Sequence, residues 1–447
     1  MTTVSDSIFK AYDVRGIYGK DLNEDIAYRF GRGLARYLSC KDAVVGRDMR
    51  VSSPQLAAAM IKGIVDEGCD VTDIGHTSTD GLYFAVGKFG HDCGVMITAS
   101  HNPPEYNGFK VCKSQAVPLS GDEGLRDIRD MIKGDPGAAV GGGSVAKKNY
   151  SEAYREHVLS FVKKELIKPL KIVIDAGNGM AGKTLPPVFE ELPCNITPLY
   201  FELDGTFPNH LASPIEPENI VDLQRKVKEV GADLGAAFDG DADRVFLVDE
   251  HAKPLGGDIV TAMVSKSLLE KEPGATILYN LICSKTVPET ITRFGGTAIR
   301  TRVGHALIKP LMKEHNALFG GEHSGHFYFR NNWFADSGLI ALLVCLELIS
   351  IENKPLSAIV SDIDPYFRSG EVNSTVEDIP SRLELLQERY SDGKCDTLDG
   401  ITIDYGGWWF NVRPSNTEPL LRLNMEANSH DLLGRKLPEV LRLIREG

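Results

Sequence analysis

The sequence predicts an α/β protein of several domains, and three observations support this fold class. The chain has 447 residues, which is too long for one hydrophobic core and indicates about three or four domains. Short apolar runs alternate with segments of helical spacing through most of the chain, a pattern typical of sheets covered by helices. After Asp364-Pro365, hairpin-like strands replace this alternation and predict a small α+β domain.

The composition limits the partners and the location of the protein. Lys and Arg number 49 and Asp and Glu number 62, which gives a net charge of -13. Such a surface repels nucleic acid and anionic membranes, so we expect neither as a partner. No apolar run approaches the length of a membrane span and the first residues lack the features of a signal peptide, so the expected location is cytoplasmic. The eight cysteines show no paired metal or redox spacing and are interpreted as reduced packing residues.

The first segment shows the alternation of strands and helices most clearly. Helical spacing over 25–38 is followed by a short strand at 43–46, a helix that opens at Ser53-Pro54, and a strand at 69–75. A further helix leads to the strand that ends before Ser100. This order is typical of a doubly wound sheet, in which ligands bind outside the carboxyl ends of the strands.

Ser100 is the first candidate for a chemical centre. The apolar run 95–99 ends at this hydroxyl beside His101, and the chain then turns through Asn-Pro-Pro and Asn-Gly. A buried strand in this position delivers one side chain to a loop at its end. The alternative is that Ser100 only starts a turn or caps a helix. Arg15 lies upstream in a segment expected to be a loop, where alone it would be a solvated charge.

A phosphate-binding loop is a second possibility. After a glycine-rich linker at 134–144 and a helix over 150–166, a strand at 170–175 leads into residues 177–184, which match G-x-x-x-x-G-K-[ST]. An ATP- or GTP-binding P-loop is therefore a rival hypothesis. The short span before the next domain favours the alternative, a tight strand-to-helix turn.

The sequence Asp239-Gly240-Asp241-Ala242-Asp243-Arg244, ahead of a strand at 245–248, is a candidate metal loop. Three carboxylates at alternate positions converge on one hard cation if the loop curls, and oxygen ligands favour Mg²⁺. A solvated acidic turn is the alternative, but repulsion among three close carboxylates is costly without a cation. An EF-hand is disfavoured because Arg244 stands where the sharp turn requires glycine.

Two polar loops follow in the second half of the chain. Glu322, Ser324 and the neighbouring histidines on a glycine-flanked loop suit sugar hydroxyls, although their spacing fits a metal cluster or a polar turn equally well. The sequence Arg413-Pro414-Ser415-Asn416-Thr417 combines a guanidinium, two hydroxyls and an amide, which suit a phosphate dianion. As a lone loop it would more often be a turn.

Four motifs in this order make the chain resemble the α-D-phosphohexomutases, and within them the phosphomannomutase/phosphoglucomutase branch. They are Thr98-Ala99-Ser100-His101-Asn102-Pro103, Asp239-Gly240-Asp241-Ala242-Asp243-Arg244, Gly321-Glu322-His323-Ser324-Gly325-His326 and Arg413-Pro414-Ser415-Asn416-Thr417. The ordered set is far more specific than any one motif. The resemblance implies three related mixed α/β domains and a C-terminal α+β domain around a central cleft, with boundaries expected at 1–148, 149–252, 253–364 and 365–447. It also implies that 175–182 is a structural loop of the second domain.

The resemblance further implies roles for individual residues. Ser100 would be carried as a phosphoserine whose phosphate oxygen completes a Mg²⁺ site with Asp239, Asp241 and Asp243. The groups that would neutralise the transferring phosphoryl group are Lys110, Arg244 and Arg15, and those that would transfer a proton or position a hydroxyl are His101 and His305. The expected sugar-binding residues are Gly304, His305, Glu322, Ser324 and His326. The non-reacting phosphate would be bound by Arg413, Ser415, Asn416 and Thr417.

The activity implied by the resemblance is that of a phosphomannomutase, which also accepts glucose phosphates and uses a hexose 1,6-bisphosphate as intermediate and activator. Hexose phosphates are then the partners, and a monomer or homodimer is expected. Phosphoglucomutase or phosphoglucosamine mutase activity is the nearest alternative; a P-loop nucleotide-binding protein and a non-catalytic sugar-phosphate sensor are alternatives from other classes. His323 does not decide the sugar, because the mannose/glucose branch commonly has Met there and the glucosamine branch Gln. The run 103–109 favours the mannose/glucose branch, whereas 280–285 resembles a family substrate loop only loosely.

Overall fold

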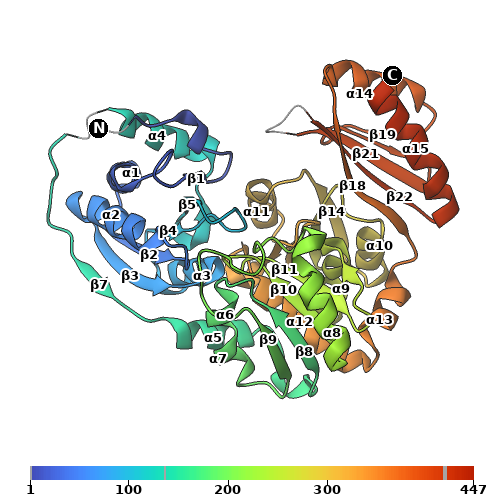
Figure 1. Ribbon diagram of the computed structural model, residues 1–447, viewed down its shortest axis with the longest axis horizontal. Helices are drawn as coiled ribbons and strands as arrows, with labels where there is room; N and C mark the ends of the chain where they lie inside the picture. The colour runs from blue at the N-terminus through green and yellow to red at the C-terminus, as the bar shows by residue number, and fades with distance from the viewer. Residues whose placement is uncertain (1–2, 135–136, 416–419, 447) are drawn as a thin grey trace.

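The computed structural model describes residues 3–134, 137–415 and 420–446. Its strands form four separate sheets, and we call each sheet with the helices around it a domain. The first domain lies at one end of the molecule and the fourth at the other, with the second and third between them (Figure 1). The predicted fold class is confirmed, since three mixed α/β sheets are followed by one antiparallel sheet.

The first domain contains a sheet in the strand order β1-β5-β4-β2-β3-β7, with β6 paired to β5. Its strands are β1 (Val14–Ile17), β2 (Asp42–Arg47), β3 (Asp70–His76), β4 (Cys93–Ile97), β5 (Tyr106–Lys113), β6 (Val117–Pro118) and β7 (Val145–Lys147). Its helices are α1 (Glu24–Leu38), α2 (Ser53–Asp66), α3 (Thr79–Phe89) and α4 (Leu125–Lys133). Side chains alternate across the sheet, so Val45 of β2 packs with α1, α2 and α4, whereas Val44 packs with α3.

The second and third domains have sheets in the orders β12-β11-β10-β8-β9 and β14-β13-β15-β16-β17. The second domain consists of α5 (Ser151–Leu159), β8 (Lys171–Asp175), α6 (Ala181–Thr184), α7 (Pro186–Phe189), β9 (Asn195–Leu199), α8 (Val221–Val230), β10 (Leu234–Phe238), β11 (Val245–Asp249) and β12 (Pro254–Leu255). The third consists of α9 (Gly257–Lys271), β13 (Thr276–Asn280), α10 (Thr286–Arg293), β14 (Thr297–Thr301), α11 (His305–Glu314), β15 (Phe319–Gly321), β16 (Phe327–Phe329), β17 (Ala335–Asp336), α12 (Gly338–Glu352) and α13 (Leu356–Ile363).

The three sheets share one arrangement around a central strand. The central strands β4, β10 and β15 each pair in parallel with one neighbour, which is β2, β8 or β13. On the other side each pairs with the antiparallel strand that follows it in the chain, which is β5, β11 or β16. The loops 98–105, 239–244 and 322–326 therefore occupy equivalent places at the ends of the three central strands.

The fourth domain is an antiparallel sheet in the order β18-β22-β21-β20-β19 with two helices. Its elements are β18 (Phe367–Thr375), α14 (Ile379–Arg389), β19 (Lys394–Asp396), β20 (Ile401–Asp404), β21 (Trp408–Pro414), β22 (Leu420–Ala427) and α15 (His430–Glu446). Short 3₁₀ helices elsewhere in the chain are η1 (Asp6–Ile8), η2 (Ser114–Ala116), η3 (Gly121–Glu123), η4 (Lys164–Leu166), η5 (Pro217–Ile220) and η6 (Arg330–Asn332). The predicted hairpin near the C-terminus is formed by β20 and β21.

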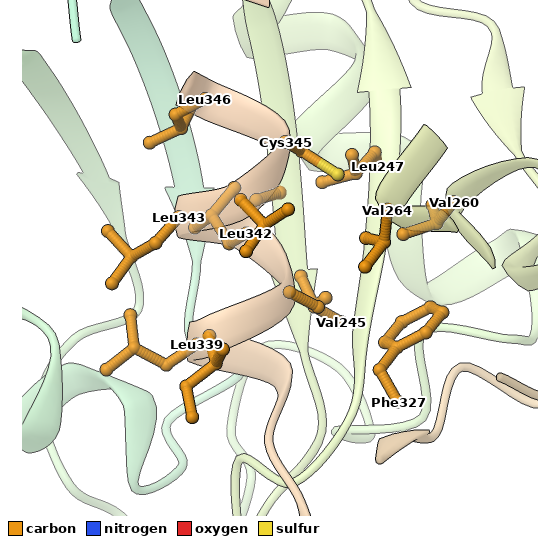
Figure 2. Packing of buried hydrophobic residues seen from close by; sticks show 14 of the residues in the cluster. Val245, Leu247, Val260, Val264, Phe327, Leu339, Leu342, Leu343, Cys345 and Leu346 are labelled. Carbon is orange, nitrogen blue, oxygen red and sulfur yellow. The ribbon is translucent and has the colours of Figure 1, made fainter. Parts of the chain in front are cut away.

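Helix α12 joins the cores of the second and third domains. It is apolar on all sides, as expected of a helix buried within a protein. Figure 2 shows Leu342 and Cys345 of α12 beside Val245 and Leu247 of β11. One cluster of buried side chains spans both domains, whereas the first and fourth domains each have a cluster of their own. No helix in the described part of the chain combines the length and the apolar character that crossing a membrane requires.

The helix predicted over 150–166 is shorter in the structure, because α5 ends at Leu159. The segment that follows packs against α12 of the third domain. There the backbone N–H of Lys163 donates to Glu347 Oε1 at 2.9 Å and that of Lys168 donates to Ser350 Oγ at 3.0 Å. These contacts replace the hydrogen bonds that would have continued the helix.

Three smaller differences concern the edges of the sheets. Arg15 lies in β1, paired with Gly108 of β5, and not in a loop. The glycine-rich linker ends in β7, which adds a parallel edge strand beside β3. The second sheet includes β12, which follows the boundary expected at 252 and pairs with β11. Short edge strands such as these carry little periodicity, so the sequence pattern does not reveal them.

Candidate active site

Ser100 follows β4 and is almost fully buried, with 3% of its surface exposed. Its φ of +51° lies in the left-handed region, which is unusual for a residue other than glycine. The loop is held by its surroundings, because Ser100 N donates to Thr98 Oγ1 and Arg50 donates to the Ser100 carbonyl, both at 2.9 Å. Gly240 of the second domain approaches so closely that a Cβ there would lie 2.4 Å from the Ser100 carbonyl oxygen.

The serine hydroxyl meets the acidic loop of the second domain. Ser100 Oγ donates to Asp239 Oδ2 at 2.7 Å. Asp239, Asp241 and Asp243 are buried, and one oxygen from each lies within 4.8 Å of the other two. Asp241 Oδ1 and Asp243 Oδ1 are buried and have no hydrogen-bond partner among the described residues. Carboxylate oxygens with free lone pairs fit a hard cation such as Mg²⁺, so these residues can hold a metal ion.

Two cations partly offset the three carboxylates. Lys110 Nζ lies 2.7 Å from Asp241 Oδ2 and 2.5 Å from Asp243 Oδ2, and Arg244 Nε lies 3.0 Å from Asp239 Oδ2. Burial raises the pKa of Asp239 to about 7, although Arg244 opposes the shift. Burial acts in the same direction on Asp241, but Lys110 outweighs it and holds the pKa of Asp241 below its usual value.

His101 lies beside the serine on the same loop. Its Nδ1 is 3.3 Å from Ser100 Oγ and also contacts the Arg244 guanidinium. The charge of Arg244, and then burial, hold the pKa of His101 well below its usual value. The imidazole is therefore neutral at pH 7 and a weak base, and it can accept a hydrogen bond. Arg15 reaches the same loop, since its guanidinium donates to the Asn102 side chain.

Glu322 is the buried carboxylate of the third-domain loop. It accepts from the Tyr328 hydroxyl at 2.5 Å and from the backbone N–H of Gly304 at 3.2 Å. Gly304 has a φ of +137°, which favours glycine, and stands directly before α11. Ser324 is half-buried on the same loop. Helix α11 begins at His305, whose side chain lies outside the described part of the structure.

His326 connects this loop to the metal loop. The backbone of His326 forms a β-bridge with Arg244, and its Nδ1 lies 4.0 Å from Asp243 Oδ1. The same nitrogen is 2.8 Å from Asp336 Oδ2. Burial alone would lower the pKa of His326, but the hydrogen bond with Asp336 and the charge of Asp243 raise it. The loops of the first three domains therefore meet at one place.

The fourth-domain motif lies at the end of β21. Arg413 is 9% exposed and donates to Glu371 Oε2 at 3.0 Å, while burial lowers its pKa. Ser415 Oγ accepts from Arg422 at 3.4 Å. Within the described residues, Arg413 has no contact with the Ser100 loop or the acidic loop. Two further predicted residues, Asn416 and Thr417, lie outside the described part of the chain.

The sequence did not identify two residues that hold this site together. Thr79, the first residue of α3, donates from Oγ1 to Asp241 Oδ2 at 2.5 Å and from its backbone N–H to the Asp241 carbonyl at 2.9 Å. Arg50 is 1% exposed, pairs with Asp48 at 3.2 Å and donates to four carbonyl oxygens of the loop 100–106. Both follow the ends of parallel strands, where ligand-binding residues are expected. Their position after the end of a strand is the sequence signal that could have identified them.

The P-loop hypothesis for residues 177–184 is wrong. A P-loop binds phosphate with free backbone N–H groups, whereas here those groups donate within the protein. The donors are Gly177, Asn178, Gly179, Met180, Gly182, Lys183 and Thr184, and their acceptors are a neighbouring aspartate and backbone carbonyls. Helix α6 is only four residues long, and Lys183 Nζ donates to the His76 carbonyl at 2.8 Å. The segment is a tight turn, as the alternative interpretation stated.

Comparison with known proteins agrees with this arrangement. Four profiles match consecutive parts of the chain: phosphoglucomutase/phosphomannomutase alpha/beta/alpha domain I at residues 6–136, domain II at 148–256, domain III at 256–366 and the C-terminal domain at 371–443. The chain belongs to the phosphoglucomutase/phosphomannomutase family. A phosphomannomutase from Escherichia coli strain K12 is 38% identical over 98% of this chain and 99% of its own length. One from Methanocaldococcus jannaschii is 41% identical over 98% and 97%.

A solved structure of a phosphoglucomutase/phosphomannomutase family protein from Burkholderia thailandensis has a TM-score of 0.90 and 33% sequence identity, and the match covers 100% of this chain and 99% of the other. Phosphoglucomutase/phosphomannomutase family members are phosphohexomutases, which are isomerases that move a phosphoryl group within a sugar phosphate. The chain is therefore an enzyme of this type. The buried acidic cluster agrees with the metal dependence of the family.

Proposed function

We propose that this phosphohexomutase is a phosphomannomutase that interconverts mannose 6-phosphate and mannose 1-phosphate and also accepts the corresponding glucose phosphates. The observation that carries the proposal is the buried Ser100 hydroxyl, 2.7 Å from Asp239 in a cluster of three carboxylates and two cations. Such a cluster suits a serine that carries a phosphoryl group. The relatives that are 38–41% identical include phosphomannomutases, which supports mannose phosphates as substrates.

The reaction consists of two transfers through Ser100. In the first, the bond between phosphorus and Ser100 Oγ breaks while a free sugar hydroxyl oxygen bonds to phosphorus, and the hydroxyl proton leaves to a base. The product is a hexose 1,6-bisphosphate. In the second, the phosphoryl group at the other end of the sugar returns to Ser100 Oγ, and the new sugar hydroxyl takes up a proton. The phosphoserine is regenerated, so the net reaction moves the phosphate between positions 1 and 6.

The residues around Ser100 stabilise charge on the transferring group. Asp239, Asp241 and Asp243 would hold Mg²⁺ together with a phosphate oxygen of the serine. When bound, Mg²⁺ supplies positive charge that stabilises the phosphoryl oxygens. Lys110, Arg244 and Arg15 add charges of the same sign, as reactions of this class require.

Proton transfer or the positioning of the sugar hydroxyl is assigned to His101 and His305. The charge of Arg244 and burial hold the pKa of His101 well below its usual value, so its imidazole is neutral at pH 7 and a weak base, which favours the positioning role. Its Nδ1 lies 3.3 Å from Ser100 Oγ, next to the position of the transferred group. His305 follows Gly304 at the start of α11 and is the second candidate.

The other two loops would bind the ends of the sugar phosphate. Gly304, Glu322, Ser324 and His326 offer donors and acceptors to the sugar hydroxyls. Arg413, Ser415, Asn416 and Thr417 would bind the phosphate that is not reacting. Because the bisphosphate must turn around between the two transfers, we further propose that the fourth domain, which has a core of its own, moves to release and rebind it.

Replacement of Ser100 tests the proposal. Ser100→Ala should remove both the stoichiometric phosphate label on the protein and nearly all turnover of mannose 1-phosphate. Ser391→Ala, at an exposed position of the fourth domain, is the matched control and should keep both. Full labelling and turnover in Ser100→Ala would disprove the assignment. Rates with mannose, glucose and glucosamine 1-phosphates, with and without a chelator, then decide the sugar, and binding without Mg²⁺-dependent turnover would identify a sensor instead.

A further inference from the structure

A groove between the first and second domains concentrates positive charge outside the site described above. It consists of two adjoining hollows of about 150 and 320 Å³ that share Ile74 and Asn149. The cationic side chains that line it are Arg47, Lys147, Lys148, Arg155 and Lys183, together with His76. Asp73 is the one acidic residue among the described residues of the lining. On a chain with a net charge of -13, this local excess of cations is a distinct feature.

The three lysines of the groove have no acidic partner among the described residues, whereas Arg47 and Arg155 each have one. Arg155 Nη2 lies 3.8 Å from Glu152 Oε1. Lys147 and Lys148 are exposed, and no carboxylate of the described residues lies within ion-pair distance of either. Lys183 donates to a backbone carbonyl, that of His76, rather than to a carboxylate. Arg47 binds Asp73 through Nη1 at 3.0 Å, but its Nε is buried without a partner in the described part of the chain.

The pKa values of the groove agree with an uncompensated positive charge. Burial and then the charge of Arg47 lower the pKa of His76, and Lys183 acts in the same direction. Burial and Arg47 also lower the pKa of Lys183. Cations that shift one another in this way repel each other, and an anion placed between them would remove the repulsion.

The size of the two hollows and the charge of the chain favour a small ligand over a nucleic acid or a membrane. The larger hollow reaches the lower end of the range of small-molecule sites, which is roughly 300–1,000 Å³. Asn149 and Ser151 at the start of α5 line the smaller hollow and add an amide and a hydroxyl to its polar groups. The negative charge of the whole chain opposes nucleic acids and anionic membranes. We propose that the groove binds a small phosphorylated molecule with at least two negative charges, at a site separate from Ser100.

Two short segments connect the groove to the candidate active site. Arg47 ends β2, and the pair of Asp48 and Arg50 that follows it holds the Ser100 loop. His76 ends β3, and Thr79, which begins the next helix, binds the metal-loop residue Asp241. A ligand of the groove would therefore contact the two strand ends that support the reacting serine and the metal loop.

Calorimetric titration with inorganic pyrophosphate in the presence of a chelator tests the proposal. Arg413→Ala is included in every protein, so that the phosphate contact proposed for the active site is removed. Lys147→Glu with Lys148→Glu should weaken pyrophosphate binding by at least about tenfold, because it removes two charge-assisted contacts and adds two negative charges. Lys228→Glu with Lys253→Glu changes the net charge equally at exposed positions outside the groove and should change binding by less than about twofold at physiological salt.

A second measurement does not depend on variants. Pyrophosphate should slow acetylation of Lys147, Lys148 and Lys183 in the unmodified protein, as measured by mass spectrometry, and should leave Lys228 unaffected. Equal weakening by the two double variants, equal protection of Lys228, or no binding at millimolar pyrophosphate would overturn the proposal. Sedimentation with phosphatidylcholine vesicles that contain phosphatidic acid, without binding of free pyrophosphate, would overturn the assignment to a small molecule.

Discussion

Replacing Thr79 with valine should weaken metal binding while leaving the fold intact. The Thr79 side chain is fully buried, and its hydroxyl donates to Asp241 Oδ2 at 2.5 Å. Valine has nearly the same shape, so the packing of α3 is kept while the donor is lost. Asp241 would keep Lys110 as a partner at 2.7 Å, and its carbonyl would keep the backbone N–H of residue 79. The substitution therefore removes one contact that orients the carboxylate.

The size of the effect follows from that contact. A hydrogen bond to a charged group contributes about 1.5–3 kcal/mol, which corresponds to about 10–100-fold in affinity. Loss of a partner that orients a metal ligand changes metal affinity or activity by about 10–100-fold in other metal sites. We expect the same range for Thr79→Val in the dissociation constant of Mn²⁺ and in the Mg²⁺ concentration for half-maximal turnover. Thr79→Ser keeps the hydroxyl and should change both by less than about threefold.

Calorimetric titration with Mn²⁺ measures the affinity without relying on turnover. Thermal unfolding in a chelator shows whether the metal-free variants are folded. Thr79→Val should melt a few degrees below Thr79→Ser, because the buried Asp241 carboxylate loses a donor, and both should show one cooperative transition. The reasoning is refuted if Thr79→Val binds Mn²⁺ as the wild type does. It is also refuted if Thr79→Ser loses as much affinity as Thr79→Val, because the hydroxyl would then not be the group that positions the carboxylate.

Three further predictions concern charge, thiols and pH. Lys110→Met should destabilise the metal-free protein by about 3–5 kcal/mol, because it leaves buried carboxylates without their cation. Thermal unfolding should show that Mg²⁺ raises the melting temperature of this variant again. An equal melting temperature with and without chelator would contradict the prediction. Cys40 Sγ and Cys69 Sγ lie 2.9 Å apart but are buried, so oxidised glutathione should convert them to a disulfide, with release of reduced glutathione, only through slow openings of the native state. The linked peptide should accumulate over hours and be missing from Cys69→Ser, and its absence from the wild type would contradict the contact. Burial opposes the charge of His210, but Asp175 at 3.0 Å raises the His210 pKa. This stabilisation is complete below about pH 6.5 and is lost as the pH rises through the raised pKa, so the free energy of unfolding should differ more between wild type and His210→Gln at about pH 6 than at about pH 8.

The sequence was sufficient for the chemical groups of the site, because each motif is local. The run from Asp239 to Arg244 places three carboxylates and a cation within one turn, and Ser100 ends an apolar strand, so both patterns were visible without the fold. The contact between Thr79 and Asp241 joins residues 162 positions apart, and no periodicity reveals such a pairing. The same applies to Arg50, which no motif of the sequence includes but which is buried against the carbonyl groups of the Ser100 loop.

The equivalence of the loops in the first three domains could be recognised only from the fold. In sequence the segments around Ser100, Asp241 and Glu322 share no residue pattern. In the structure each connects a central parallel strand to its antiparallel neighbour, because the three sheets repeat one topology. The β-bridge between Arg244 and His326 and the hydrogen bond between Ser100 and Asp239 then join the loops to one another. One strand topology, repeated in three sheets, brings the serine, the acidic loop and the sugar-binding candidates together.

The charges in this junction explain why the phosphate proposed on Ser100 and the proposed metal ion should depend on each other. Three carboxylates face two cations, Lys110 and Arg244, which leaves an excess negative charge. Burial is the main cause of the raised pKa of Asp239, and the charges of Asp243 and Asp241 add to it, so a proton on Asp239 relieves part of this excess when no metal is bound. A phosphate on Ser100 adds about -1.5 to -2 charges beside these carboxylates, and a divalent cation offsets that addition. A bound metal ion therefore lowers the free energy of a phosphate on Ser100, and the phosphate lowers the free energy of metal binding by the same amount.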